Sequence, residues 1–150
     1  MKYIGHYHEE DLPPPHSPDQ GRHVDWSLKM MVDHQLGAHH LRMFIVQFAP
    51  GGTMKTHDHP FEEAYLVLEG EIVITLAGEE HRLGPGDYAW AGVGAPHSFR
   101  NEGNVTMRFL EVQAPPPPAQ MASRWLEDWV QREAETGTHG PSPLEAAGRP

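Results

Sequence analysis

Short runs of apolar, β-branched and aromatic residues alternate with glycine and proline clusters along most of the chain. The clearest run, residues 40–49, reads HLRMFIVQFA and stops at Pro50-Gly51-Gly52. Such runs are typical of strands, and their regular punctuation predicts an all-β sandwich or barrel. The other expected strands are residues 24–32, a candidate edge strand, and residues 63–68, 71–77, 87–91, 97–101 and 105–113.

The barrel is expected over residues 24–114, and the segments on either side differ from it in composition. Residues 1–23 are rich in proline, histidine and acidic residues, which predicts an N-terminal arm with little secondary structure. Residues 115–135 begin with four consecutive prolines, which favour extended polyproline II, and are expected to form a linker and a helix. Residues 136–150 have little to bury, so we expect a flexible tail.

One C-terminal α-helix is predicted over residues 123–135, which read SRWLEDWVQREAE. Ser123 is a candidate N-cap, and Trp125 and Trp129 are spaced i and i+4 on one helical face. We expect these two tryptophans to pack on the barrel or on a partner chain.

Composition excludes several classes of function. The formal net charge of −10 opposes binding to nucleic acid or to an anionic membrane surface. The chain has no cysteine, which excludes disulfides, thiolate zinc sites and cysteine nucleophiles. No signal peptide and no apolar run of membrane-spanning length are visible, so we expect a soluble cytoplasmic protein.

The segment GGTMKTHDHPFEEAYLVLEG, residues 51–70, brings His57, His59 and Glu63 close together in sequence. Alternate residues of a strand point to the same side, so His57 and His59 can converge on one ion. A straight strand would place Glu63 roughly 20 Å from His57. Pro60 favours a turn between them, and such a bend predicts a metal site.

A further ligand is expected from His97, which begins a strand after the turn-prone residues 92–96. Three neutral imidazoles and one carboxylate suit one divalent transition ion better than calcium or magnesium, which prefer oxygen ligands. Iron, manganese, nickel, cobalt, copper and zinc all stay open as the identity of this ion.

These residues resemble the two sequence motifs of the cupin superfamily. The first motif, G-x5-H-x-H-x3,4-E-x6-G, is matched at every spacing from Gly51 through His57, His59 and Glu63 to Gly70.

The second cupin motif, G-x5-P-x-G-x2-H-x3-N, is matched from Gly86 through His97 to Asn101, with Gly92 where the family has proline. The resemblance covers about residues 40–113. It implies a small single-domain cupin, whose fold is a double-stranded β-helix, also described as a jelly-roll barrel. It also implies one metal ion inside the barrel, held by His57, His59, Glu63 and His97.

Four protein ligands on an octahedral ion leave two adjacent positions, which suit a chelating small-molecule substrate or a substrate with dioxygen. The resemblance to cupins implies dioxygenase, isomerase, lyase, cyclase or aminohydrolase chemistry. We expect an oxygenase-type reaction because a nitrogen-rich site suits redox metals. The alternatives are a non-redox cupin enzyme and a non-catalytic metal- or ligand-binding cupin. Glu63 and Tyr65 are the candidate catalytic residues, and a homodimer is expected, since an unpaired edge strand favours association.

The remaining polar and aromatic residues are assigned to the surface or to the core. Asp58 and Glu62 are expected to face solvent. Arg42, Gln47 and Glu111 interrupt apolar runs; we expect exposed positions, with a role in the pocket as the alternative. The other histidines weighed as ligands are expected at the surface: His6, His8, His39, His40 and His81. The expected core aromatics are Phe44, Tyr65, Trp90, Phe99 and Phe109.

Overall fold

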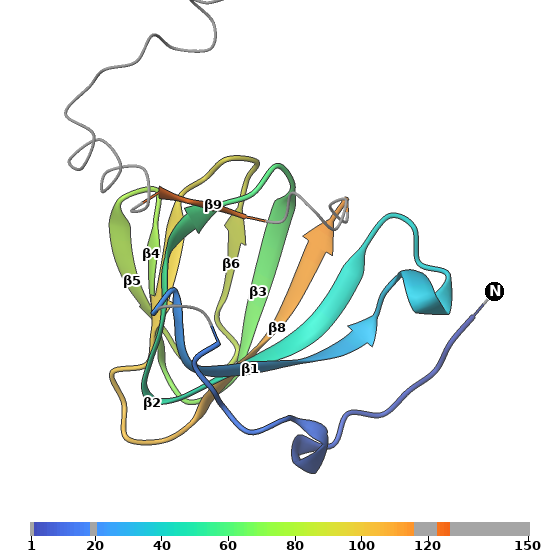
Figure 1. Cartoon of the computed structure of the whole chain (residues 1–150), viewed down its shortest axis with the longest axis horizontal. Coiled ribbons are helices and arrows are strands. Elements are labelled where there is room, and N and C mark those ends of the chain that lie inside the picture. The colour runs from blue at the N-terminus through green and yellow to red at the C-terminus, as the bar shows by residue number, and fades with distance from the viewer. Residues whose placement is uncertain (1, 19–20, 116–122, 127–150) are drawn as a thin grey trace, which may run out of the picture.

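The computed structural model describes residues 2–18, 21–115 and 123–126, whose strands form one curved sheet that nearly closes into a barrel (Figure 1). The strand order is β5-β4-β7-β2-β8-β3-β6, and β1 and β9 both pair with β2. The all-β barrel expected from the sequence is therefore confirmed. The strands are β1 (His23–Val32), β2 (Arg42–Asp58), β3 (Glu62–Glu69), β4 (Ile72–Leu76), β5 (Glu79–Leu83), β6 (Tyr88–Ala91), β7 (His97–Arg100), β8 (Met107–Ala114) and β9 (Arg124–Trp125), with the 3-10 helices η1 (Glu9–Asp11) and η2 (His34–Leu36).

Strand β2 is longer than expected, because it continues through Pro50-Gly51-Gly52 to the candidate metal ligands. Its first half pairs with β1 and β8, and its second half pairs with β7. A Cβ atom at Gly52 would lie 2.8 Å from the Asp25 carbonyl oxygen, so the close approach at this bend requires glycine. The backbone of Asn101 holds the bend. Its backbone carbonyl accepts a hydrogen bond from the Gly51 amide, and its backbone amide donates one to the Gly52 carbonyl.

Alternation along the strands separates the barrel interior from its outer surface. Tyr65, Phe99 and Phe109 are buried and pack together, with ring centroids 5.2 Å apart for Tyr65 and Phe99 and 5.3 Å apart for Phe99 and Phe109. Together with buried Phe44, they confirm that part of the expected core. The prediction for Trp90 is wrong: its side chain is 60% exposed, because its neighbour Ala91 takes the inward position on β6.

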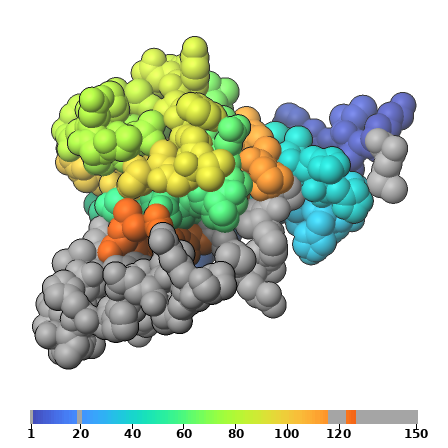
Figure 2. Space-filling view, turned by 90° about the horizontal axis from the view of Figure 1, so that it is seen from above, coloured from blue at the N-terminus to red at the C-terminus, as the bar shows by residue number. Residues whose placement is uncertain are grey.

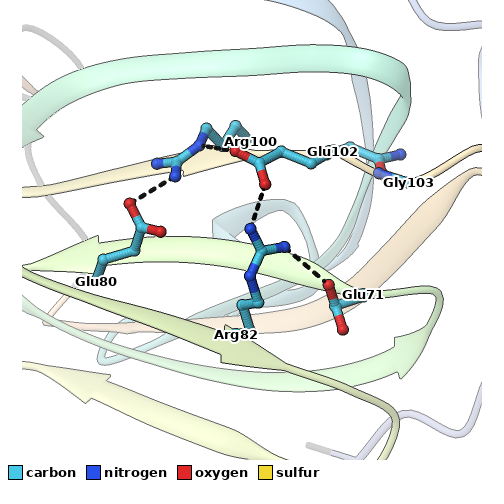
Figure 3. Close-up of polar contacts among 7 residues, drawn as sticks. Glu71, Glu80, Arg82, Arg100, Glu102 and Gly103 are labelled. Carbon is cyan, nitrogen blue, oxygen red and sulfur yellow. Dashed lines mark hydrogen bonds and ion pairs between the residues drawn. The ribbon is translucent and has the colours of Figure 1, made fainter.

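Strand β5 was not predicted, because its sequence, EEHRL, has no apolar alternation. It pairs with β4, and its side chains join a network of ion pairs on the outer surface (Figure 3). Arg82 contacts Glu71 and Glu102 at 3.1 and 2.5 Å, and Arg100 contacts Glu80 and Glu102 at 2.5 and 2.6 Å. Solvent screens such pairs, so the register of β5 is supported more by the backbone ladder than by these charges.

The prediction that a helix begins at Ser123 is wrong, because Arg124–Trp125 forms strand β9. Strand β9 is antiparallel to the end of β2, with Trp125 opposite His57 and Arg124 opposite Asp58. These tertiary contacts override the local helical pattern. The polyproline segment from residue 116, residues 127–135 of the expected helix, Trp129 and the tail 136–150 lie outside the described residues.

The N-terminal arm lies against the outer side of β1 and β2. The Pro13 carbonyl accepts hydrogen bonds from Ser27 Oγ at 2.6 Å and Gln47 Nε2 at 2.9 Å. Gln47 is therefore buried beneath the arm, and the expectation of an exposed position was wrong. No helix among the described residues is long and apolar enough to cross a membrane.

Candidate metal centre

Three histidine side chains converge inside the barrel from separate parts of the chain. His57 and Asp58 are the last two residues of the long strand β2, and His59 follows that strand directly. His97 is the first residue of β7 and pairs with His57. One nitrogen atom from each ring lies within 4.8 Å of the others, and all three residues are buried. The turn before His97 is tied to the first motif, since the Gly94 amide donates to the His59 carbonyl at 2.8 Å.

Glu63 on β3 completes this group. Its Oε1 atom lies 3.2 Å from His59 Nε2, and its Oε2 atom lies 3.0 Å from His97 Nε2. The structure thus brings together all four residues that the sequence proposed as metal ligands. Burial alone would raise the pKa of the Glu63 carboxyl, but His97, His59 and the Tyr65 hydroxyl outweigh it and lower the pKa to about 2.

Backbone carbonyls fix the tautomers of two of these imidazoles. His57 Nδ1 lies 2.7 Å from the Lys55 carbonyl oxygen, and His97 Nδ1 lies 2.9 Å from the Ala95 carbonyl oxygen. A carbonyl oxygen only accepts, so each Nδ1 carries the hydrogen and each neutral ring keeps its Nε2 lone pair. Burial, and then the repulsion between the His57 and His97 imidazoles when both carry a proton, lowers the pKa of His57 to about 3, so the His57 ring is neutral at ordinary pH.

The chemistry of these donors fits a divalent transition ion. His97 Nε2 is buried against the Glu63 carboxylate. It faces a Glu63 oxygen at 3.0 Å, and two acceptors this close repel each other unless a proton or a cation lies between them. Three imidazole nitrogens with one carboxylate suit iron, manganese, nickel, cobalt, copper or zinc.

Two side chains hold the Glu63 carboxylate in place. The Tyr65 hydroxyl donates to Glu63 Oε2 at 2.5 Å, and Gln113 Nε2 donates to Glu63 Oε1 at 2.5 Å. Burial, followed by the charge of Glu63, raises the pKa of Tyr65 well above its ordinary value, so this hydroxyl keeps its proton and stays a donor.

A second buried carboxyl group and an arginine extend this network. Gln113 Nε2 also donates to Glu111 Oε1 at 2.6 Å, while Gln113 Oε1 accepts from Arg42 Nε. Burial and then the charge of Glu63 raise the pKa of Glu111 well above its ordinary value, and burial lowers the pKa of Arg42. Glu111 and Arg42 therefore occupy the pocket rather than the exposed face that the sequence favoured.

Asp58, between the two histidines of the first motif, does not face solvent as expected. It is 4% exposed and forms an ion pair with Arg124, whose Nε lies 3.0 Å from Asp58 Oδ1. Beside it, the Trp125 ring packs on the His57 ring with centroids 4.8 Å apart. Strand β9 thus covers one end of the barrel, where it lies at the surface (Figures 1 and 2).

Two cavities meet at this end of the barrel. The inner one, about 120 Å³, is lined by the four candidate ligands together with Trp26, Leu28, Arg42, Phe44 and Glu111, among others. The outer one, about 460 Å³, is lined by Asp58, Pro60, Val93 and Arg124 and shares His59 and Ser123 with the inner cavity. His59 therefore lies between the two spaces.

Comparison with known proteins agrees with the motifs and the geometry. Residues 44–113 match the family model of the cupin domain. This chain carries a cupin domain. Its cupin barrel is similar to that of the polyketide cyclase RemF from Streptomyces resistomycificus, with a TM-score of 0.69, 25% identity, and coverage of 83% of this chain and 86% of that chain.

Two curated proteins are similar to the cupin region. The tetracenomycin polyketide synthase protein TcmJ of Streptomyces glaucescens is 36% identical over 74 residues, which are 49% of this chain and 50% of that protein. Quercetin 2,3-dioxygenase of Bacillus subtilis is 40% identical over 57 residues, which are 37% of this chain and 17% of that protein. The chain thus spans half or less of the length of these curated relatives.

Sequence reasoning did not single out Gln113, Phe61 or Arg124. Gln113 and Glu111 are spaced i and i+2 in a largely apolar strand, a pattern that places two polar side chains on one face. Phe61 is 1% exposed and stacks on His59 with centroids 4.5 Å apart, but its sequence position alone gives no sign of this. The role of Arg124 follows from its contact with Asp58, which lies 66 positions away in the sequence.

Proposed function

We propose that the protein is a metal-dependent enzyme that acts on a small organic substrate with two oxygen atoms able to chelate one divalent ion. The observation that carries this proposal is the convergence of three buried imidazoles, with nitrogens within 4.8 Å of one another, and of the Glu63 carboxylate, which lies 3.2 Å from His59 Nε2 and 3.0 Å from His97 Nε2. His57, His59, Glu63 and His97 would hold the ion, and iron, manganese, nickel, cobalt, copper and zinc all suit this set.

We favour a β-dicarbonyl compound as the substrate and ring closure as the reaction. Polyketides carry such groups, and both TcmJ and RemF are polyketide proteins by name. When bound, a divalent ion supplies positive charge that polarises carbonyl oxygens and acidifies the C–H between them. Ring closure of the aldol type needs no oxidant, since one proton leaves that carbon and one returns to the attacked carbonyl oxygen.

The side chains of the cavity suit this transfer of protons. Glu111 lines the cavity, and its raised pKa keeps a proton at a pH where an exposed glutamate is ionised. We assign Glu111 the role of donating its proton to the attacked carbonyl oxygen, while the proton that leaves the carbon is released to solvent, which then reprotonates Glu111. Glu63 and Tyr65, the candidate catalytic residues, act together: the Tyr65 hydroxyl orients the Glu63 carboxylate toward the ion.

The size of the cavities fits a substrate of which only one group enters the barrel. The inner cavity of about 120 Å³ is slightly smaller than an engineered cavity of about 150 Å³ that binds benzene. It therefore has room for the five atoms of a β-dicarbonyl group. The rest of a larger substrate would lie in the outer cavity of about 460 Å³, beyond His59.

Oxygenase-type chemistry, the reaction expected from the sequence, is the second candidate. It is supported by the similarity to quercetin 2,3-dioxygenase and by the nitrogen-rich set of ligands. A chelating substrate is common to both candidates.

Oxygen consumption separates these candidates. Protein purified without an affinity tag is analysed for metal, loaded with the metal found, and incubated with β-diketones, catechols and poly-β-ketones with and without oxygen. Product formed equally well without oxygen supports ring closure, whereas product formed only with stoichiometric oxygen uptake supports the dioxygenase. A metal-loaded protein that neither binds nor converts any of these compounds would overturn the proposal and favour a non-catalytic cupin. His97→Gln removes one candidate ligand and should abolish conversion, whereas the matched control His81→Asn, at an exposed histidine, should retain it.

A further inference from the structure

Arg42 is an unusual arginine among the described residues. Arg82, Arg100, Arg108 and Arg124 each form an ion pair with a carboxylate. Arg42 donates its Nε–H to Gln113, but its two Nη groups make no hydrogen bond or ion pair within the described part of the chain. Neither Nη group is enclosed without a partner, so both are accessible and can donate to a ligand that enters the cavity.

The position of Arg42 brings this charge close to the candidate metal site. Its guanidinium carbon lies 5.7 Å from the centroid of the Phe44 ring and 5.9 Å from that of the Phe61 ring. Phe61 in turn stacks on His59, and Arg42 lines the same cavity as the four candidate ligands. The two aromatic rings and the hydrogen bond to Gln113 hold the guanidinium on the cavity wall.

The charge of this cavity is positive once a divalent ion is bound. A divalent ion balanced by the single ligand carboxylate Glu63 keeps positive charge, to which Arg42 adds. The cavity therefore offers unused donors and excess positive charge, a combination that selects an anion.

We infer that Arg42 determines specificity by binding a carboxylate that the substrate carries beside its chelating oxygens. This inference rests on the proposed function and narrows it to β-dicarbonyl acids. A guanidinium presents planar, paired N–H donors that match the two oxygens of a carboxylate, which a lysine ammonium does not.

Two small probes that differ in one carboxylate test this inference. Pentane-2,4-dione and 2,4-dioxopentanoate share the β-diketone group, and only the second has a carboxylate. Their dissociation constants are measured by calorimetry on the metal-loaded protein. Since hydrogen bonds to charged groups contribute about 1.5–3 kcal/mol, we expect the wild type to prefer the acid by about tenfold to a hundredfold. Arg42→Met should reduce this preference to about twofold or less, and Arg42→Lys should restore only part of it.

Several outcomes separate the inference from its alternatives. Arg82→Met, at an exposed arginine outside the cavity, is the control and should keep the full preference. A purely structural role for Arg42 predicts that Arg42→Met weakens both probes and the retention of metal to the same extent, which would overturn the inference. Equal binding of both probes by the wild type would also overturn it while leaving the chelating substrate intact. If neither probe binds, a β-dicarbonyl substrate is ruled out, and the inference fails together with the favoured ring-closure reaction.

Discussion

His97 Nε2 lies 3.0 Å from Glu63 Oε2 inside the barrel, and both residues are at most 2% exposed. The Ala95 carbonyl holds the hydrogen of the ring on Nδ1, so a lone pair of the neutral imidazole faces the carboxylate. A cation between these two acceptors would convert a repulsive contact into two bonds. Metal should therefore stabilise the folded protein strongly, since an ion that binds only the folded state raises its stability.

Removal of one imidazole should reduce metal binding sharply. Loss of a residue that merely supports a ligand typically lowers metal affinity about 10–100-fold, and we expect His57→Ala and His97→Gln to lower it by at least as much. Metal content and affinity are measured on protein purified without a tag, with His81→Asn as the control. Stoichiometric metal retained inside the barrel of His57→Ala would show that the assignment is wrong.

The stability of the metal-free protein should fall as the pH falls below about 6.5. The folded-state pKa of His57 is lowered to about 3 from 6.5, so between these values the unfolded chain binds a proton that the folded protein does not. Stability therefore rises with pH in this window and is lost as the pH falls through it. The folded-state pKa of Glu63 is lowered to about 2 from 4.5, so Glu63 also reduces the stability as the pH falls below about 4.5.

Urea unfolding at intervals from pH 7 to pH 4 measures this dependence. His57→Gln has no proton to gain at this position, so its stability should depend less steeply on pH between 6.5 and 4.5. With metal present the wild-type slope should be steeper still, because protons also compete with the ion for the imidazoles. Identical slopes for the metal-free wild type and His57→Gln would contradict the neutral, buried state of this ring.

The ion pair between Asp58 and Arg124 should contribute more to stability than the ion pairs of the outer network. Asp58 is buried, so Arg124→Met would leave a buried carboxylate without its partner, at a cost of about 1–3 kcal/mol. Arg82→Met removes pairs that are exposed to solvent (Figure 3), and we expect it to cost about 1 kcal/mol or less. Denaturant unfolding of both variants checks the order of these two values.

The double variant Asp58→Asn with Arg124→Met is the control for this comparison. It removes the charge as well as its partner, so it should recover part of the stability lost in Arg124→Met.

Fluorescence of Trp125 should report bound metal, since the Trp125 ring packs on His57 and its emission should be quenched by bound copper or cobalt. Quenching that is unchanged in Trp125→Phe would place the ion away from this ring.

The part of this site that the sequence predicted is the part that depends on local periodicity. Strand geometry predicts that His57 and His59 share one face, and that Glu63 and Tyr65 share one face. The turn between these two pairs follows from Pro60. The contact of β9 with Asp58 and the chain from Arg42 through Gln113 to Glu63 do not, because each depends on pairing between distant strands. Polar residues within an apolar strand signal burial in a network but do not identify their partners.

We expect the homodimer to form through the outer face of β3 and β6 rather than through the edge of β1. Leu66, Tyr88 and Trp90 are 38%, 79% and 60% exposed on this face, and Leu66 pairs with Tyr88 across the two strands. Strand β6 also ends the order of the sheet, so one of its edges has no strand partner among the described residues. An exposed aromatic face beside an open edge favours association with a second copy of the chain.

Trp90→Glu should convert the dimer into a monomer, because a charge at the centre of this face would have to be buried without a partner. Light scattering at micromolar concentration should give twice the chain mass of 16.8 kDa for the wild type and the chain mass itself for this variant. Leu41→Glu adds the same charge at an exposed apolar residue outside this face and should leave the dimer intact. A wild-type monomer would rule out the dimer, whereas a dimer that survives Trp90→Glu would return the interface to the edge of β1. Metal content should be the same for both variants, since Trp90 points away from the candidate ligands and its neighbour Ala91 points inward.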